Sequence, residues 1–153
     1  MGVVEHSCLL RVRYSETDQM GTYYNSRPLE WFECGRSELL RAMELPYSSM
    51  EQRGIRLPLV EAHVFYHGKA RYDDELRVTT RVSLVGKARM RFDVTVVHAA
   101  DEQRVVHGHT VHAIIGANGR PVRPPEWLSA KLPAEGAEPE PTGNSWQGSW
   151  EQQ

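Results

Sequence analysis

The first residues that could do chemistry lie in one short run, residues 15–28, with the sequence SETDQMGTYYNSRP. This run contains the carboxylate of Asp18, a glycine three residues later, and a proline at which a helix can begin. The first N–H groups of a helix have no partner inside it, so those near Tyr24 and Asn25 could stabilise negative charge on a bound oxygen. Asp is also a common turn residue that accepts hydrogen bonds from its own backbone. Spacing alone favours this turn interpretation for Asp18.

Two further acids are weaker candidates for chemistry. Glu16 precedes the turn, and we expect it to be a solvated or salt-bridged surface residue. Glu61 lies near the start of a predicted strand, where alternation places it on one face with His63 and Phe65. There it could hold a water molecule or a ligand, or simply be a charge on an edge strand.

Six of the seven histidines fall between residues 63 and 112, namely His63, His67, His98, His107, His109 and His112. Of these, His107 and His109 share one face of a predicted strand. No third ligand follows them in the sequence at a spacing typical of a zinc site. We therefore expect polar histidines on strand faces and no metal ligands.

Changes in hydrophobic period predict where the elements begin and end. Residues 7–14 alternate as a strand does. From Pro28 to Met43, apolar residues fall three or four apart, as on one face of an amphipathic helix. Gly35 in the middle of that helix costs about 1 kcal/mol relative to Ala. Its presence indicates a close approach to another backbone, so we predict a helix laid tightly on a sheet.

The remainder of the chain is predicted to be mainly β structure after a short helix at residues 47–54. Alternating or apolar runs predict four strands that follow one another as a meander, within residues 55–68, 76–84, 88–96 and 104–115. The order of these elements indicates an α+β fold with one antiparallel sheet around one helix. Beyond about Leu132 the chain is rich in Pro, Gly and Glu without an apolar period, which is typical of a disordered tail.

Length and charge exclude several classes of protein. A chain of 153 residues fits one domain with a genuine core. A formal charge of −2 gives no basic field that would attract nucleic acid or anionic lipid. No stretch approaches the roughly 18 apolar residues of a membrane span, and the N-terminus lacks the layout of a signal peptide. We therefore expect a cytoplasmic protein that does not bind nucleic acid.

Two stretches follow a recognisable pattern. The first, RYSETDQMGTYYNSRPLEWFECGRSELLR at residues 13–41, has an Asp, a Gly three residues on, an aromatic before the helix, and LxWFExxRxELLR. The second is EAHVFYHGKARYDDELRVTTRV at residues 61–82. Together they resemble the hotdog-fold acyl-CoA thioesterases of the 4-hydroxybenzoyl-CoA thioesterase-like family, over about residues 5–130. The chain departs from that family's pattern at Asn25, Arg27 and Pro28, so the resemblance does not specify the acyl group.

The resemblance implies one hotdog domain over residues 1–132, with an antiparallel sheet wrapped around one long central helix, and a tail over residues 133–153. It also implies hydrolysis of an acyl-CoA thioester to a free acid and CoA, without a separate cofactor. Asp18 would be the nucleophile or general base, and the N–H groups at the helix start, including that of Asn25, the oxyanion site.

Other residues could bind such a substrate. By type and position, Tyr24 and Glu61 are candidates near the acyl group. Lys87 and Arg89 at the hairpin turn could bind the phosphates of CoA or be ordinary solvated residues, and the resemblance implies that they could serve the neighbouring subunit's site. A homodimer or homotetramer is expected, because pairing of two sheet edges removes an exposed edge strand.

Three alternatives to this interpretation remain. The chain could act on acyl carrier protein, or it could bind acyl-CoA without turnover as a hotdog sensor or assembly module. A hotdog dehydratase is disfavoured, because Asn25 lies where that enzyme would need a His.

Overall fold

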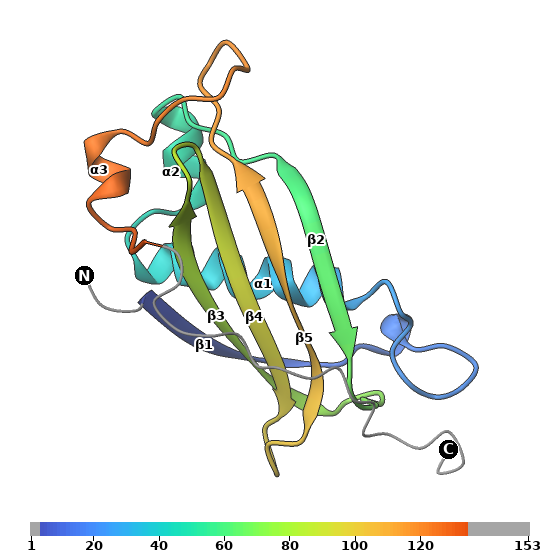
Figure 1. The fold of residues 1–153 in the computed structure, drawn as a ribbon. Coiled ribbons are helices and arrows are strands. Elements are labelled where there is room, and N and C mark those ends of the chain that lie inside the picture. Colours follow the sequence, from blue (N-terminus) through green and yellow to red (C-terminus); the bar gives the residue numbers. More distant parts are fainter. Residues whose placement is uncertain (1–3, 135–153) are drawn as a thin grey trace.

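A five-stranded antiparallel sheet, with one long helix packed across one face, forms the fold in a computed structural model that describes residues 4–134 (Figure 1). The strands are β1 (Val4–Arg11), β2 (Leu59–Tyr66), β3 (Glu75–Val85), β4 (Arg89–His98) and β5 (Arg104–Ala113). The helices are α1 (Pro28–Ala42), α2 (Tyr47–Gln52) and α3 (Glu126–Ser129), and a 3₁₀ turn, η1 (Tyr14–Glu16), follows β1. The predicted α+β class, with one long helix on one antiparallel sheet, is confirmed.

The strands lie in the order β1-β3-β4-β5-β2. β3, β4 and β5 form a meander as predicted, and Gly86, with a φ of 60°, lies in the turn between β3 and β4. The prediction that all four later strands form one meander was wrong for β2, which pairs with β5 at the far edge of the sheet. Alternation indicates which side chains face the core, but it does not specify which strand is the neighbour.

Helix α1 lies tightly on the sheet at Gly35. A methyl group built on this residue would lie 2.4 Å from Oγ1 of Thr80 and 2.7 Å from Cγ1 of Val78, both on β3. The close approach predicted from the glycine is therefore confirmed, although its partners are side chains of β3 rather than a backbone. A larger residue at this position would lift α1 from the sheet.

Apolar side chains fill two clusters between α1 and the sheet. Trp31 of α1 packs in one cluster with Tyr23, which belongs to the segment before the helix. Leu40, further along α1, packs in the other with Met50 of α2 and Leu128 of α3. Burial of one large apolar side chain contributes about 1.5–3 kcal/mol. Tyr23 therefore anchors the segment before α1 firmly to the core.

The ordered chain continues past the predicted domain boundary at residue 132. The N–H of Leu84 at the end of β3 donates to the carbonyl of Pro133 at 2.8 Å, and Ala134 forms a parallel bridge with the same residue. The rest of the predicted tail, residues 135–153, lies outside the described residues. Within residues 4–134, no helix has the length and apolar character needed to cross a membrane.

Candidate functional site

Asp18 lies in the segment that joins β1 to α1, which we call the site loop (residues 12–27). The Asp18 N–H donates to the carbonyl of Thr22 at 2.9 Å, and the Gly21 N–H donates to the carbonyl of Asp18 at 3.1 Å. Carboxylate oxygen Oδ1 of Asp18 accepts a hydrogen bond from the N–H of Met20 at 2.8 Å. The turn role of this Asp is therefore present. Its other oxygen, Oδ2, contacts no donor in the described part of the chain, and the side chain is half-buried.

Glu16, two residues before Asp18, is a buried carboxylate. Its oxygen Oε2 accepts a hydrogen bond from the indole N–H of Trp31 at 3.0 Å, and Oε1 accepts one from the backbone N–H of Arg13 at 2.7 Å. The Arg13 guanidinium lies 3.4 Å from Oε2. The prediction of a surface residue was wrong, because the buried face of α1 carries an indole N–H that needs an acceptor. Glu16 thereby ties the site loop to the first turn of α1.

The N–H groups before α1 differ from the expected arrangement. The N–H of Tyr24 is not free, because it donates to the carbonyl of Glu16 at 2.7 Å. No acceptor contacts the N–H of Asn25 or Ser26 among residues 4–134. Asn25 is exposed, and its carbonyl accepts a hydrogen bond from the hydroxyl of Tyr66 at 2.5 Å. The remaining candidate oxyanion donors are therefore the N–H groups of Asn25 and Ser26.

The two adjacent tyrosines of the site loop have different environments. Tyr23 is buried, its hydroxyl donates to the carbonyl of Gly68 at 3.0 Å, and its ring meets that of Trp31 edge-on. Burial, with a smaller contribution from Tyr66, raises the pKa of Tyr23 well above its ordinary value. Tyr24 is 51% exposed. Only Tyr24 is accessible to a ligand, as its prediction for substrate binding requires.

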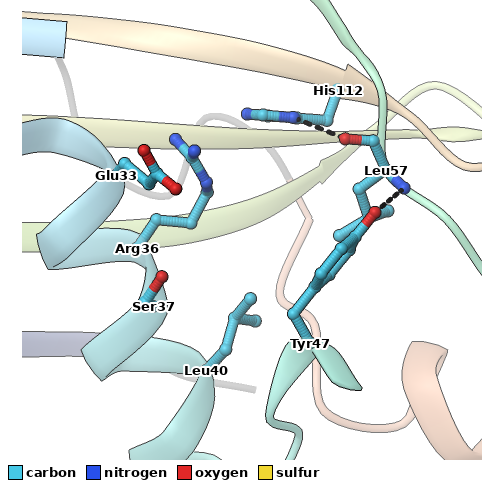
Figure 2. A pocket seen from close by; sticks show the side chains of 7 residues that line it. All are labelled: Glu33, Arg36, Ser37, Leu40, Tyr47, Leu57 and His112. Atoms are coloured by element: carbon cyan, nitrogen blue, oxygen red, sulfur yellow. Dashed lines mark hydrogen bonds between the residues drawn. The ribbon is translucent and has the colours of Figure 1, made fainter. Parts of the chain in front are cut away.

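A cavity of about 180 Å³ lies beside α1 (Figure 2). Its lining comes from α1, α2, the segment before β2, and β5, and consists of Glu33, Arg36, Ser37, Leu40, Tyr47, Leu57 and His112. Figure 2 shows that Glu33, Arg36 and Ser37 of α1 lie on one side of the cavity, with Tyr47 on the other. Burial lowers the pKa of Arg36, which lies 5.8 Å from the centre of the Phe92 ring.

The surroundings of His112 in this cavity favour its neutral form. Its Nδ1–H donates to the carbonyl of Leu57 at 3.0 Å, and its Nε2 lies 3.1 Å from the hydroxyl of Thr110. Burial is the main cause that lowers the pKa of His112, and the nearby charge of Arg36 lowers this pKa further. The sequence gives no signal for this cavity, because α1, α2 and β5 come together only in the folded chain.

The structure does not bring the other predicted substrate-binding residues to Asp18. Lys87 and Arg89 are exposed at the β3–β4 turn. β1 leads into the site loop, and its last residue, Arg11, pairs with the first residue of β3, at the opposite end of that strand from the turn. An 11-residue strand is roughly 30 Å long. Contact of Lys87 and Arg89 with a neighbouring subunit's site stays a prediction.

Glu61 also lies away from the site loop. It is exposed on β2, and the Nε2–H of His63 donates to its Oε1 at 2.9 Å. This hydrogen bond is the main cause that lowers the pKa of Glu61. The pair faces away from α1, because His63 is paired with His109 of β5 and His109 with Asp93 of β4, whereas Phe92 points toward the helix.

Comparison with known proteins identifies the family. The model of the thioesterase-like superfamily matches residues 12–132. The chain belongs to this superfamily. The resemblance predicted from the two sequence stretches is therefore confirmed.

Relatives of this thioesterase-like chain carry related names. The putative acyl-CoA thioesterase YneP of Bacillus subtilis (strain 168) is 38% identical over 71 residues, which cover 46% of this chain and 51% of that protein. The chain thus spans about half the length of this relative. A putative esterase of Aquifex aeolicus (strain VF5) is 30% identical over 116 residues, which cover 76% of this chain and 88% of that protein.

A solved structure supports the fold of this thioesterase-like chain. The 1,4-dihydroxy-2-naphthoyl-CoA thioesterase Slr0204 from Synechocystis superposes with a TM-score of 0.78 at 19% identity, covering 84% of this chain and 95% of that chain. At this identity the likeness concerns the fold, and it confirms the predicted hotdog architecture.

Proposed function

We propose that this protein hydrolyses an acyl-CoA thioester to a free acid and CoA, with Asp18 as nucleophile or general base. One observation carries the proposal: the site loop holds a half-buried carboxylate in the same short segment as the N–H groups of Asn25 and Ser26. One oxygen of that carboxylate and both N–H groups have no hydrogen-bond partner within residues 4–134. Membership of the thioesterase-like superfamily supports the reaction class. CoA enters as part of the substrate, and the reaction needs no separate cofactor.

In the general-base route, Oδ2 of Asp18 takes a proton from water and the oxygen of that water attacks the thioester carbon. The N–H groups of Asn25 and Ser26 donate to the carbonyl oxygen as it becomes negative. The tetrahedral intermediate collapses, the C–S bond breaks, and the CoA thiolate takes up the proton. In the nucleophilic route, Oδ2 attacks the carbon itself, the C–S bond breaks and the CoA thiolate leaves. Water then hydrolyses the resulting anhydride, which returns the Asp18 carboxylate, releases the free acid and supplies the proton that the thiolate takes up. The bond from Met20 to Oδ1 orients the carboxylate in both routes.

The cavity beside α1 is our candidate for the acyl-binding site. Glu33 follows the first residue of α1 by five positions, which is about 8 Å along the helix axis. A volume of about 180 Å³ is smaller than the roughly 300–1,000 Å³ of pockets that enclose a drug-sized ligand. It therefore suits a short acyl group, and the charges of Glu33 and Arg36 favour one that carries a polar substituent.

We propose that the working form is a homodimer or homotetramer in which a second copy contributes to CoA binding. Edge strand β2 supports association, because Leu59 and Val60 on it are 53% and 49% exposed. Lys87 and Arg89 are exposed cations at the β3–β4 turn. In such an assembly they would bind the phosphates of CoA held at the neighbouring subunit's site loop.

A thiol-release screen tests the proposal most broadly. Short, medium, long and aromatic acyl-CoAs are offered to the wild type and to Asp18→Asn, with release of CoA followed by a thiol reagent. Asp101→Asn is a matched control, because Oδ1 of Asp101 accepts the N–H of Gln103 at 3.0 Å in the same kind of turn. We expect turnover of at least one substrate, lost in Asp18→Asn and kept in Asp101→Asn. If the wild type released no thiol from any of them, acyl-CoA hydrolysis would be refuted.

Three further measurements separate the two alternative functions, the carrier-protein enzyme and the binding module. Strong inhibition by free CoA indicates a site that binds the nucleotide end, whereas weak inhibition with turnover of acyl carrier protein indicates the carrier-protein enzyme. Calorimetric binding of acyl-CoA without release of thiol indicates a binding module.

A further inference from the structure

A group of polar side chains lies on the face of the sheet that is turned away from α1. His63 of β2 is directly opposite His109 of β5, and Asp93 of β4 is directly opposite His109 on its other side. Glu61 precedes His63 by two residues on the same face of β2. The pairing of β2 with β5 therefore brings two imidazoles and a carboxylate together from two strands.

The ligand atoms of these three residues are close to one another. One nitrogen of His63, one of His109 and one carboxylate oxygen of Glu61 all lie within 4.8 Å of each other. The Nε2 of His63 is 2.9 Å from Oε1 of Glu61, and the two imidazole rings are stacked with their centres 4.6 Å apart. The side chains of Glu61 and His63 are 47% and 49% exposed, so solvent reaches the group.

We propose that Glu61, His63 and His109 form a binding site for a divalent transition-metal ion of the zinc class. Two imidazole nitrogens and one carboxylate oxygen are a recognised donor set for Zn²⁺, and a water molecule completes the tetrahedron. Ligand distances of about 2.0–2.2 Å place ligand atoms about 3.4 Å apart in a tetrahedral site. Because the two imidazole rings are stacked, a bound ion requires the half-exposed Glu61 and His63 side chains to turn until their ligand atoms converge on it with that of His109.

The charges around the group are compatible with a cation. Arg91 is the nearby positive charge, and its guanidinium is paired with the carboxylate of Asp93 at 3.1 Å. That pairing offsets the repulsion between Arg91 and a bound ion. The carboxylate of Glu61 supplies a negative charge directly to the ion.

The ion would fasten edge strand β2 to β5. Its site is separate from the site loop and from the cavity, because it lies on the opposite face of the sheet from α1. The sequence offered no third ligand near His107 and His109. In the folded chain, the pairing of β2 with β5 brings two ligands, Glu61 and His63, to His109, and His107 is not part of the group. The inference does not depend on the proposed hydrolysis.

Metal titration tests the proposal directly. The full chain without an affinity tag is treated with a chelator, dialysed, and titrated with ZnCl₂ in a calorimeter and with CoCl₂ by visible absorption. We expect about one ion per chain, intense absorption bands of four-coordinate Co²⁺, and a higher melting temperature with Zn²⁺. His63→Ala and Glu61→Gln should each weaken binding at least about tenfold. His6→Ala, a strand histidine outside the group, is the control and should bind as the wild type does.

Two results would overturn the proposal. One is a wild type that binds neither ion. The other is zinc binding of wild-type strength in Glu61→Gln and in His63→Ala/His109→Ala. Glu61→Gln keeps the size of an exposed side chain, so it tests the site even if the double histidine variant does not fold. Circular dichroism verifies the fold of each variant.

Discussion

Replacement of Gly35 by Ala tests how tightly α1 lies on the sheet. Ala is a better helix residue than Gly by about 1 kcal/mol, so an exposed helix would gain stability. Here the new methyl group would lie 2.4 Å from Oγ1 of Thr80 and 2.7 Å from Cγ1 of Val78. To relieve these two clashes, α1 and β3 must move apart by about 1 Å. Overpacking of this kind costs about 1–3 kcal/mol. Two simultaneous clashes favour the upper part of that range, which leaves a net loss of about 1–2 kcal/mol.

The assay is urea unfolding followed by far-ultraviolet circular dichroism, for Gly35→Ala, Thr80→Ala and the double variant. Oγ1 of Thr80 is buried without a hydrogen-bond partner among the described residues, so its removal costs no hydrogen bond. It also removes the shorter of the two clashes. The double variant should therefore be more stable than the sum of the two single changes predicts. A Gly35→Ala protein more stable than the wild type, or strict additivity in the double variant, would refute the tight packing.

Three further predictions concern single side chains. Glu16→Ala should lower the free energy of unfolding by about 3 kcal/mol, because the Trp31 indole N–H loses a charged acceptor; a loss below about 1 kcal/mol in urea unfolding would contradict this role. The folded state lowers the pKa of His112, so the unfolded state binds its proton first as pH falls below about 6.5. Stability should therefore fall from pH 7 to pH 5, and more steeply in the wild type than in His112→Gln; equal slopes of the urea midpoint with pH would count against a neutral His112. Burial, followed by the neighbouring Cys34, raises the pKa of Cys8 to about 11, whereas Cys34 is exposed. Iodoacetamide at pH 8 should then label Cys34 first, as read by peptide mass spectrometry, and faster labelling of Cys8 would disprove the assignment.

Local patterns in the sequence predicted most of the elements. The period change at Pro28 located α1, and strict alternation on both sides of the turn at Gly86 located β3 and β4. Gly35 indicated the tight contact between helix and sheet. These features depend on neighbours in the chain, which the sequence displays directly. The place of β2 beside β5 depends on pairing between distant segments, and alternation is the same for either neighbour.

The candidate site was predicted only in part for the same reason. Asp18 and the segment before α1 belong to one continuous stretch of sequence, so the sequence alone indicates both. The environment of Glu16 depends on Trp31, fifteen residues away, and the sequence does not show that the two side chains meet. The N–H of Tyr24 seemed free by position, but it is used by the carbonyl of Glu16. The cavity at His112 combines residues of three elements, so no single stretch of sequence indicates it.

The central claim is that the carboxylate of Asp18 carries out the hydrolysis of a thioester. The most direct test is the kcat of Asp18→Asn, measured by thiol release on the best acyl-CoA of the screen, beside the wild type and the turn control Asp101→Asn. A general base typically contributes about 10²–10⁴-fold, so we predict a fall in kcat of at least about 100-fold for Asp18→Asn, with unchanged circular dichroism. Asp101→Asn should keep the wild-type kcat. A folded Asp18→Asn protein with a kcat within about threefold of the wild type would contradict the claim, because a loss that small is far below the contribution of a general base.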